Sequence, residues 1–467
     1  MSLWWVWYDC VAPLRSSCSR QRSFYWMVIV LAGLSIRNEI AGVSSIIRAL
    51  GLRGSCYRRL LHLCHSPALS IVRLRQAWIV LVYRRFRPQR IGGRLVVIGD
   101  GLKVAKEGRK MPAVKKLYQS SENNSKAEYI FGHSFQALGL LVVGAAQTLC
   151  CVPLTSAIHE GVVFSNRDQR TLLDRFAELG LQVAQALGEP ILLLADAYYA
   201  SAKVLRPLLK AGHHVLCRVK SNAVAYRPAP QPATPRRGRP RVYGEKVRFR
   251  DLWRSSAFET LRCTLYGEQN IEVQYLSLEL LWRPVGQLVR FVLVDHPSRG
   301  RWILLCTDVT LSAQAIIEGY SYRFKIEACF KSALATLGTY AYHFWMQAMI
   351  PRPRRSGNQY LHRTSDDYRR LVRRKLDAYH RYVQLGCIAQ GLLQYLALYH
   401  HTHVWRLFRS WLRTMRPALP PSEAVVAQAL RNTWPEFLLN SPEEHSLKKF
   451  ILENTDYERC PSLRLAA

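Results

Sequence analysis

The sequence is short of acidic residues. It contains 32 Asp and Glu against 66 Lys and Arg in 467 residues, which gives a formal net charge of +34 at pH 7. The excess runs through the whole chain rather than one tail, and residues 1–90 contain arginine but no lysine. So basic a chain predicts a polyanionic partner such as nucleic acid. A ribosomal-type protein is the alternative, and the length of the chain argues against it.

Long apolar runs are also missing. The longest run covers residues 24–34, about half of the ~20 residues that a membrane-spanning helix needs, so we expect a buried helix there and no membrane partner. The first residues lack the basic segment and the cleavage site of a signal peptide. No Cys-x-x-Cys pair occurs, so neither a zinc cluster nor a redox motif is indicated. We expect a reduced, cytoplasmic protein associated with the nucleoid.

The first 90 residues read as helices. Ser44 and Ser45 are suited to cap one helix, a break follows at Gly51 to Gly54, and Ser55 is suited to cap a second helix with Arg58 and Arg59. The pattern is typical of a helix-turn-helix that lays its second helix in a DNA groove, although a plain helical hairpin has the same spacing.

Strands alternate with helices from about residue 91. Strand-like runs occur at residues 95–98, in two pieces within 128–143, and at 191–194 and 214–219, with helical patterns at 168–187 and 197–209. This order predicts the α/β class with a mixed sheet flanked by helices. Residues 221–241 form a Pro-rich basic loop, followed by strand-like runs at 271–276, 288–294 and 302–306, and a long basic helix is expected from about Asp366 to His400.

Two of the predicted strands end in aspartate. Residues 95–98 lead into Gly99-Asp100-Gly101, and residues 191–194 lead into Ala195-Asp196. Each pattern places a carboxylate at the carboxyl end of a strand, where sites of α/β proteins collect. The alternatives are an Asp-Gly turn for Asp100 and a helix N-cap for Asp196.

A third carboxylate belongs to a predicted helix. At about 100° per residue, Tyr320, Arg323, Glu327 and Lys331 lie within an arc of roughly 80° on one face. A solvated charged stripe would look similar. Asp, Asp and Glu from three separate elements are nevertheless the ligands with which a protein holds two Mg²⁺ ions for phosphoryl transfer.

These residues resemble the DDE transposases of bacterial insertion sequences, in the branch whose signature is Tyr, two residues, Arg, three residues, Glu, six residues, Lys. Tyr320, Arg323 and Glu327 match this spacing, whereas the Lys position holds Leu334 and Lys331 lies three residues earlier. The segments VVIGDGLKVAKEGRKMP, ILLLADAYYAS and LLCTDVTLSAQAIIEGYSYRFKIEACF also look like the family's three catalytic regions.

The resemblance implies an RNase H-like core that cuts and rejoins DNA. Asp100, Asp196 and Glu327 would bind Mg²⁺ or Mn²⁺, while Tyr320, Arg323 and Lys331 would contact the DNA. The partners implied are the terminal inverted repeats and target DNA, in a homodimer or larger complex. The expected regions are 1–90 (helical, DNA-binding), 91–220 (first part of the core), 221–310 (basic loop and β-rich insertion), 311–345 (Glu-bearing helix) and 346–467 (helical and basic). A decayed transposase that only binds DNA is the alternative.

Other cations suggest further DNA contacts. Lys103, Lys106, Arg109 and Lys110 follow Asp100 closely enough to neutralise phosphates there, although solvated loop charges are an equal alternative. Arg237, Arg239 and Arg241 form an Arg-Gly-Arg-Pro-Arg run that resembles a minor-groove AT-hook, and a flexible basic linker is the simpler interpretation.

Overall fold

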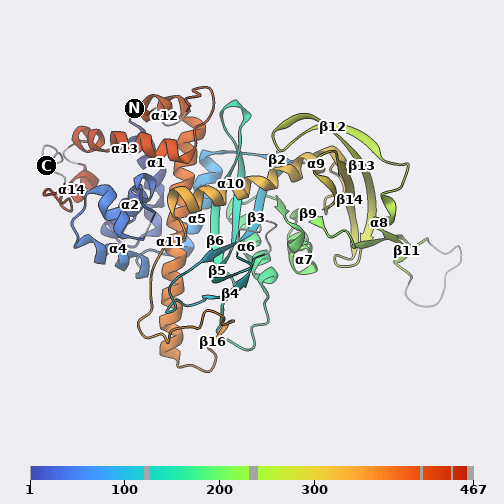
Figure 1. The fold of residues 1–467 in the computed structure, drawn as a ribbon, viewed down its shortest axis with the longest axis horizontal. Helices are drawn as coiled ribbons and strands as arrows, with labels where there is room; N and C mark the ends of the chain where they lie inside the picture. The colour runs from blue at the N-terminus through green and yellow to red at the C-terminus, as the bar shows by residue number, and fades with distance from the viewer. Residues whose placement is uncertain are drawn as a thin grey trace. The chain divides into compact units, whose positions relative to one another are not determined.

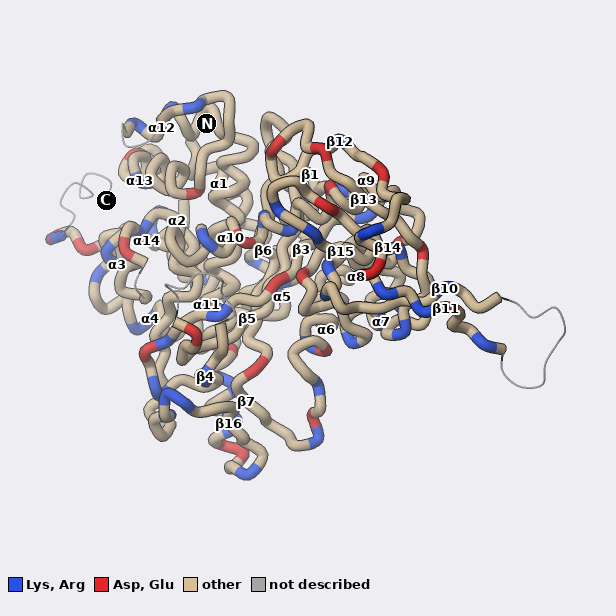
Figure 2. The backbone as a smooth tube through the Cα atoms, turned by 45° about the vertical axis from the view of Figure 1, so that its right-hand side comes forward, with Lys and Arg blue, Asp and Glu red and all other residues tan. Residues whose placement is uncertain are grey.

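The computed structural model describes residues 2–40, 42–119, 127–230, 240–410, 414–442 and 445–459 (Figure 1). The chain divides into two compact units. One, here called the helical unit, comprises Met1–Arg87, Gly101–Gln169 and Ala328–Ala467, and the other, the sheet unit, comprises Pro88–Asp100 and Arg170–Glu327. Figure 2 shows Lys and Arg recurring along both units rather than in one tail.

The helical unit takes its helices from both ends of the chain. They are α1 (Leu3–Val11), α2 (Gln21–Ile36), α3 (Ser44–Leu50), α4 (Cys56–His65), α5 (Ile71–Arg85), α11 (Asp366–Tyr399), α12 (His401–Phe408), α13 (Glu423–Asn440) and α14 (Ser446–Leu452), with shorter turns η1 (Ala12–Ser17), η2 (Ala145–Gln147) and η5 (Ala333–Leu337). Helix α11 lies beside α2, α4 and α5 (Figure 1). Every residue of α2 from Trp26 to Ile36 is buried, which confirms the predicted buried helix. No described helix is long and apolar enough to cross a bilayer.

Hydrogen bonds tie the two ends of the chain together inside this unit. The indole of Trp4 donates to the carbonyl of Leu430 at 2.9 Å. Arg37 donates from Nε to the carbonyl of Leu337 at 3.1 Å. The backbone N–H of Arg53 donates to the carbonyl of Asn454 at 2.9 Å. The N-terminal helices therefore share their core and their polar partners with the C-terminal ones.

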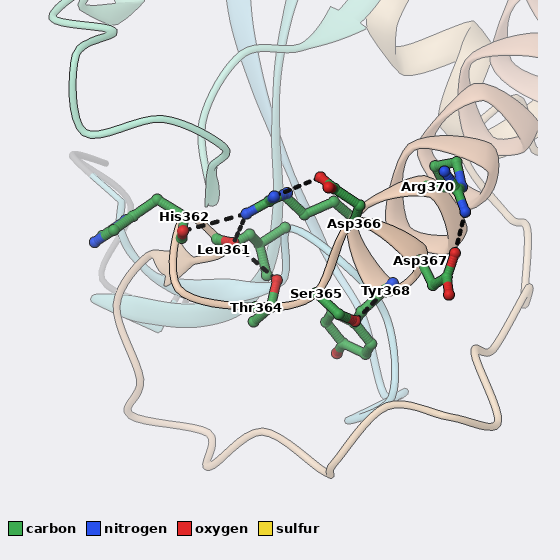
Figure 3. Close-up of polar contacts among 9 residues, drawn as sticks. Leu361, His362, Thr364, Ser365, Asp366, Asp367, Tyr368 and Arg370 are labelled. Atoms are coloured by element: carbon green, nitrogen blue, oxygen red, sulfur yellow. Dashed lines mark hydrogen bonds and ion pairs between the residues drawn. The ribbon is translucent and has the colours of Figure 1, made fainter.

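The long basic helix predicted from about Asp366 is confirmed by α11. Its first turn is fixed by polar contacts, which Figure 3 shows. The hydroxyl of Ser365 accepts a backbone N–H at 3.3 Å, and Arg369 donates to the carbonyls of Leu361 at 3.3 Å and His362 at 3.2 Å. One cation of the basic run is thus used to anchor the preceding loop.

The strands of the helical unit are largely antiparallel. They are β4 (Lys115–Tyr118), β5 (Tyr129–Val143) and β6 (Leu149–Ile158), together with the short parallel pair β7 (Val162–Val163) and β16 (Gln359–Tyr360). The prediction of two strands within 128–143 is wrong, since β5 is continuous. A Cβ on Gly132 would lie 2.0 Å from the carbonyl oxygen of Val104, so this glycine marks a close approach of backbones and not a turn.

The sheet unit is built on parallel strands that continue into an antiparallel sheet. Strands β3 (Arg94–Ala105), β8 (Ile191–Ala195) and β9 (His214–Val219) are parallel, and β3 runs on into the helical unit. Antiparallel pairing then joins β9 to β15 (Gly300–Cys306), β14 (Gln287–His296) and β13 (Glu268–Trp282), which pairs with both β12 (Glu259–Leu265) and β10 (Val224–Pro228). The short strand β2 (Arg90–Ile91) pairs with β3, and the short strand β1 (Arg87–Pro88) precedes it. The predicted runs at 191–194, 214–219, 271–276, 288–294 and 302–306 all lie in strands.

The helices of the sheet unit are α6 (Leu172–Leu187), α7 (Ala202–Lys210), α8 (Phe249–Leu252) and α9 (Ala313–Ser321), with η3 (Ala197–Tyr199) and η4 (Tyr322–Phe324). Helix α10 (Lys325–Ser332) begins in this unit, and its residues from Ala328 onward belong to the helical unit. Thr171 and Asp174 form a capping box at the start of α6, and Gly188 ends it at φ 72°. The α/β class with a mixed sheet and flanking helices, as expected of an RNase H-like core, is confirmed.

One expectation for this unit is wrong. Residues 221–241 are not loop throughout, because Val224–Pro228 forms β10 and pairs with β11 (Tyr243–Arg248). The proline-rich composition of the segment suggested a loop, but β10 contains proline only at its last residue, so the backbone N–H groups before it can pair. Residues 231–239 lie outside the described part of the chain, and Arg237 and Arg239 with them.

Candidate active site

Asp100 and Asp196 lie at the same level on two adjacent parallel strands, Asp100 within β3, which continues to Ala105, and Asp196 directly after β8. The predictions that the strand of Asp100 ends there, or that Asp100 begins an Asp-Gly turn, are therefore wrong. In β3 residues Leu95 to Gly99 are buried, and all of β8 is buried. Ile98 is paired with Leu194, so the two aspartates stand two residues beyond a pair in register. Both side chains leave the buried run and are partly exposed. The sheet thus presents two carboxylates side by side, where the uniformly buried part of β3 and the whole of β8 end. The alternative reading of Asp196 as a side-chain N-cap is not supported, because it makes no capping hydrogen bond to η3.

The segment that carries Glu327 is helical but not one regular helix. Helix α9 gives way to the 3₁₀ turn η4, which continues as α10 and then as a π-turn at η5. Ser312 caps α9 by accepting the N–H of Ala315 at 3.2 Å. A Cβ on Gly319 would lie 2.8 Å from Cδ1 of Ile91, so glycine allows α9 to approach the sheet closely. Helix α9 therefore lies close to Ile91 of β2 and Leu216 of β9.

Arg323 joins two of the predicted catalytic carboxylates. Its Nη1 donates to Oδ2 of Asp100 at 2.8 Å, and its Nη2 pairs with Oε1 of Glu327 one helical turn away. Burial opposes the charge of the guanidinium, yet the nearby Tyr320, Asp100, Glu327 and Asp196 together raise the pKa of Arg323 above its ordinary value. Asp100 and Glu327 thus contact the guanidinium directly, and the charge of Asp196 acts on it without a contact.

Tyr320 is more buried than a DNA-contacting side chain needs to be. It is 5% exposed. Burial raises the pKa of its hydroxyl far above the usual range, and the charge of Asp196 acts in the same direction. So buried a side chain offers little surface to DNA, and its interaction with the charge of Arg323 favours a supporting role instead.

The chemistry of the three carboxylates suits a divalent cation, but their arrangement here does not. Asp and Glu oxygens are the ligands that Mg²⁺ and Mn²⁺ prefer. Within the described part of the chain, no three His, Cys, Asp or Glu side chains lie close enough together to hold one ion. The guanidinium of Arg323 stands as the positive partner of Asp100 and Glu327 instead.

Sequence reasoning missed two neighbours of this cluster. Arg218 follows Cys217, which is paired with Ala195, so it lies level with Asp196 on the next strand, and it is exposed. Its charge acts on the hydroxyl of Tyr320. Tyr266, in the turn between β12 and β13, is near enough to Arg323 and Glu327 for their charges to act on its pKa, which burial raises. Arg218 could have been identified from the sequence, because an arginine is unusual in a largely apolar strand such as β9.

The other predicted DNA contacts are not gathered here. Lys103, Lys106, Arg109, Lys110 and Lys331 belong to the helical unit. Lys106 is only 7% exposed and donates to the carbonyls of Tyr340 and Tyr342, so it is not placed to meet a phosphate. Lys331 is exposed on the last turn of α10. Arg241 is exposed and donates to the carbonyl of Tyr243 at 2.6 Å.

The predicted helix-turn-helix elements are present as α3 and α4, joined by a turn at Gly51 with φ 62°. The predicted cap of the first helix is wrong, because the N-cap of α3 is Val43. Ser55 is the N-cap residue of α4, as predicted, but its side chain makes no capping hydrogen bond. The hydroxyl of Ser45 is drawn instead into a buried bond from Arg37 at 2.9 Å.

Helix α4 borders a basic groove of about 510 Å³ in the helical unit. Its lining includes Arg20, Arg22, Arg58, Arg59 and His62. In the described part of the chain none of the four arginines forms an ion pair with a carboxylate. The groove therefore presents uncompensated positive charge.

Comparison with known proteins places these features in a family. Residues 13–267, more than half of the chain, match the model of a family described as DDE superfamily endonuclease. The matched range includes Asp100 and Asp196 and ends before Glu327. No curated protein sequence matches the chain. Among solved structures, the chain is similar to piggyBac transposase in a synaptic complex with hairpin DNA, at 9% identity and a TM-score of 0.39, over 94% of this chain and 77% of that one.

Proposed function

Because the chain belongs to the DDE superfamily of endonucleases, we propose that it is a transposase that cuts and rejoins DNA at the terminal inverted repeats of its own insertion sequence. The observation that carries the proposal is the cluster itself. Asp100 and Asp196 lie two residues beyond a pair in register on neighbouring parallel strands, and Glu327 is tied to Asp100 through Arg323. Asp, Asp and Glu from three elements are the residue types that hold the divalent ions of phosphoryl-transfer enzymes.

Each residue of the cluster has a proposed role. Asp100, Asp196 and Glu327 are the residues that would hold Mg²⁺ or Mn²⁺, which requires Arg323 to release Asp100 and Glu327. A bound divalent ion would supply activation of the attacking oxygen and neutralisation of the leaving oxygen. Arg323, once released, offers a planar guanidinium that binds a phosphate through two parallel hydrogen bonds. Tyr320 and the exposed Arg218 hold that guanidinium and the DNA backbone at the carboxyl edge of the sheet.

The basic groove beside α4 is the proposed site for the ends of the element. Arg58 and Arg59 are exposed on α4, and Arg20 and Arg22 face the same groove. Duplex DNA needs such charge because its affinity comes largely from phosphate contacts that displace counterions. We propose that terminal repeats bind there and that two or more copies of the chain assemble on a pair of ends.

A second candidate is a decayed transposase that binds DNA without cutting it. Two observations favour it: the described residues include no group that could hold a metal as they stand, and Leu334 occupies the family's Lys position. Both candidates predict DNA binding, and only the first predicts strand cleavage.

The experiment that tests the proposal uses the purified full chain. It is incubated with Mg²⁺ and duplex DNA carrying the sequences that flank its own gene, and the nicks are mapped on both strands. Specific nicks at the repeat boundary, absent when Mg²⁺ is omitted, support the transposase. Tight binding of the same DNA with no nick in Mg²⁺ or Mn²⁺ supports the decayed protein.

A further inference from the structure

The helical unit presents an aromatic side chain that the proposed active site does not use. Trp345 is 64% exposed, although it is among the most expensive side chains to leave in water. A single exposed hydrophobic residue needs no explanation by itself. Trp345 differs because one edge of its indole, at Nε1, packs closely against the backbone of Gly108.

Gly108 leaves the space that the edge of the indole occupies. A Cβ at Gly108 would lie 2.8 Å from Nε1 of Trp345 and 2.7 Å from Sδ of Met111, so the indole rests where only a glycine leaves room. The backbone of Gly108 does not require a glycine, because its φ is not positive. The absence of a side chain at Gly108 therefore allows the indole of Trp345 to approach the backbone closely.

Two loops joined by hydrogen bonds form a frame around the ring. Met346 donates its N–H to the carbonyl of Lys110 at 2.9 Å. The N–H of Arg352 donates to the carbonyl of Arg109 at 2.8 Å, and Nε of Arg109 returns a bond to the carbonyl of Arg352 at 2.9 Å. The position of Trp345 is thus fixed from both sides along the chain.

The frame is strongly positive. Arg109, Lys110 and Arg352 all belong to it, and their side chains bond to carbonyl groups, which do not neutralise them. Within the described residues none of the three forms an ion pair with a carboxylate. An exposed ring held among cations matches how proteins bind single-stranded nucleic acid, with bases stacked on aromatics and phosphates on cations.

We propose that Trp345 stacks an unpaired nucleobase of DNA while Arg109, Lys110 and Arg352 hold the neighbouring phosphates. The inference rests on the proposed function, since an enzyme that opens DNA ends produces unpaired bases. Charge complementarity favours a nucleic acid strand over an apolar protein partner. Arg109 and Lys110, which the sequence marked as candidate phosphate contacts, would thus bind the phosphates beside the stacked base.

The test measures binding of a fluorescein-labelled single strand of about 12 nucleotides, within the range that such sites cover. Trp345→Ala should raise its Kd about tenfold, the order expected for one stacked base, and Trp345→Phe should restore most of the affinity. A strand of equal length made of abasic sites should bind wild type and Trp345→Ala equally. Gly108→Ala, which displaces the ring without straining the backbone, should weaken binding of the base-bearing strand.

Tyr360 provides the matched control, because it is an aromatic residue of the same unit with the same 64% exposure. Tyr360→Ala should leave the Kd unchanged. An equal loss in Tyr360→Ala, an unchanged Kd in Trp345→Ala, or a change in oligomeric state without a change in strand binding would each overturn the inference. Specific nicking of duplex ends with no effect of Trp345→Ala rejects this site alone. The stacking effect without any nicking rejects the proposed function alone.

Discussion

Arg323 donates a hydrogen bond from Nη1 to Oδ2 of Asp100 at 2.8 Å, across 223 positions of sequence. Its other terminal nitrogen pairs with Glu327, one turn along the same helical segment. Both side chains of the Asp100 pair are mostly shielded, with 18% and 22% exposed. The pair therefore fixes the helical segment to the sheet edge at the point where chemistry is proposed.

Removing the proposed metal ligands one at a time should separate cleavage from binding. Asp100→Asn, Asp196→Asn and Glu327→Gln should each reduce strand cleavage by about a thousandfold or more, because several kcal/mol of transition-state stabilisation are lost. Binding of the DNA ends should stay near wild type in a gel-shift titration. A variant that retains wild-type cleavage removes its residue from the catalytic set.

Releasing the carboxylates from Arg323 should strengthen cation binding. A unit positive charge about 4 Å from a divalent ion costs several kcal/mol at an effective dielectric constant near 20, so Arg323→Gln should bind Mn²⁺ at least about tenfold more tightly. Isothermal titration calorimetry on the DNA-free protein measures this without reference to activity. Arg262→Gln, which breaks an exposed pair with Glu272 in the same unit, is the control and should not change the affinity. Unaltered Mn²⁺ affinity in Arg323→Gln would mean that the guanidinium does not compete with the ion.

The departure from the family spacing makes opposite predictions for two positions. If Lys331 has taken over the DNA contact of the missing Lys, Lys331→Ala should lower cleavage about tenfold or more, the scale of one charge-assisted hydrogen bond, while Leu334→Lys adds little. Leu334 is 39% exposed, so the lysine at that position does not bury a charge. Cleavage rates are compared alongside thermal denaturation. Enhanced cleavage in Leu334→Lys with a silent Lys331→Ala would show that the contact was lost.

Lys106 should make stability depend on pH. Burial lowers its pKa to about 7, against 10.5 for an ordinary lysine. Between these values the unfolded chain binds more protons, so the free energy of unfolding should rise with pH by up to about 1.4 kcal/mol per unit, and the contribution to the slope should vanish below pH 7. The facing groups do not titrate in this window, because burial lowers the pKa of His133 to about 3, lowers that of His343, and raises that of Tyr342.

Urea denaturation at pH 7, 8 and 9 measures this slope. Lys106→Met should remove it, whereas Lys103→Met, at an exposed position of the same strand region, should preserve it. Parallel slopes for wild type and Lys106→Met would show that Lys106 keeps its proton throughout.

The buried strand segments were predictable from sequence, whereas the full length of β3 and the burial of individual residues were not. Uniform apolar runs before Asp100 and Asp196 were enough to predict two buried strand segments, because a buried parallel strand needs nothing but apolar side chains along its length. The continuation of β3 past Asp100 to Ala105 was not predicted, because the uniformly buried run stops before Asp100 and the residues from there on alternate between half-buried and exposed. Lys106 looked like a solvated loop cation, and its burial depends on Tyr340 and Tyr342, more than 230 positions away. Such pairings have no local signature.

The helical segment shows the same division. The spacing of Tyr320, Arg323 and Glu327 was visible, but the 3₁₀ turn between α9 and α10 was not. That turn alters the rotation per residue, so a face computed at 100° per residue is only approximate beyond Tyr322. The burial of Tyr320 follows from the packing of α9 against the sheet, which Gly319 permits.

Because the two ends of the chain pack together in the helical unit, this unit cannot finish folding until the C-terminal helices have been synthesised. Trp4, Arg37 and Arg53 are translated early, while their partners Leu430, Leu337 and Asn454 leave the ribosome hundreds of residues later. A nascent chain that contains both aspartates but lacks α11 and α13 therefore exposes the apolar faces of its N-terminal helices, which those two helices would cover. Premature stop codons in the last quarter of the gene should leave a product that chaperones and proteases recognise as unfolded.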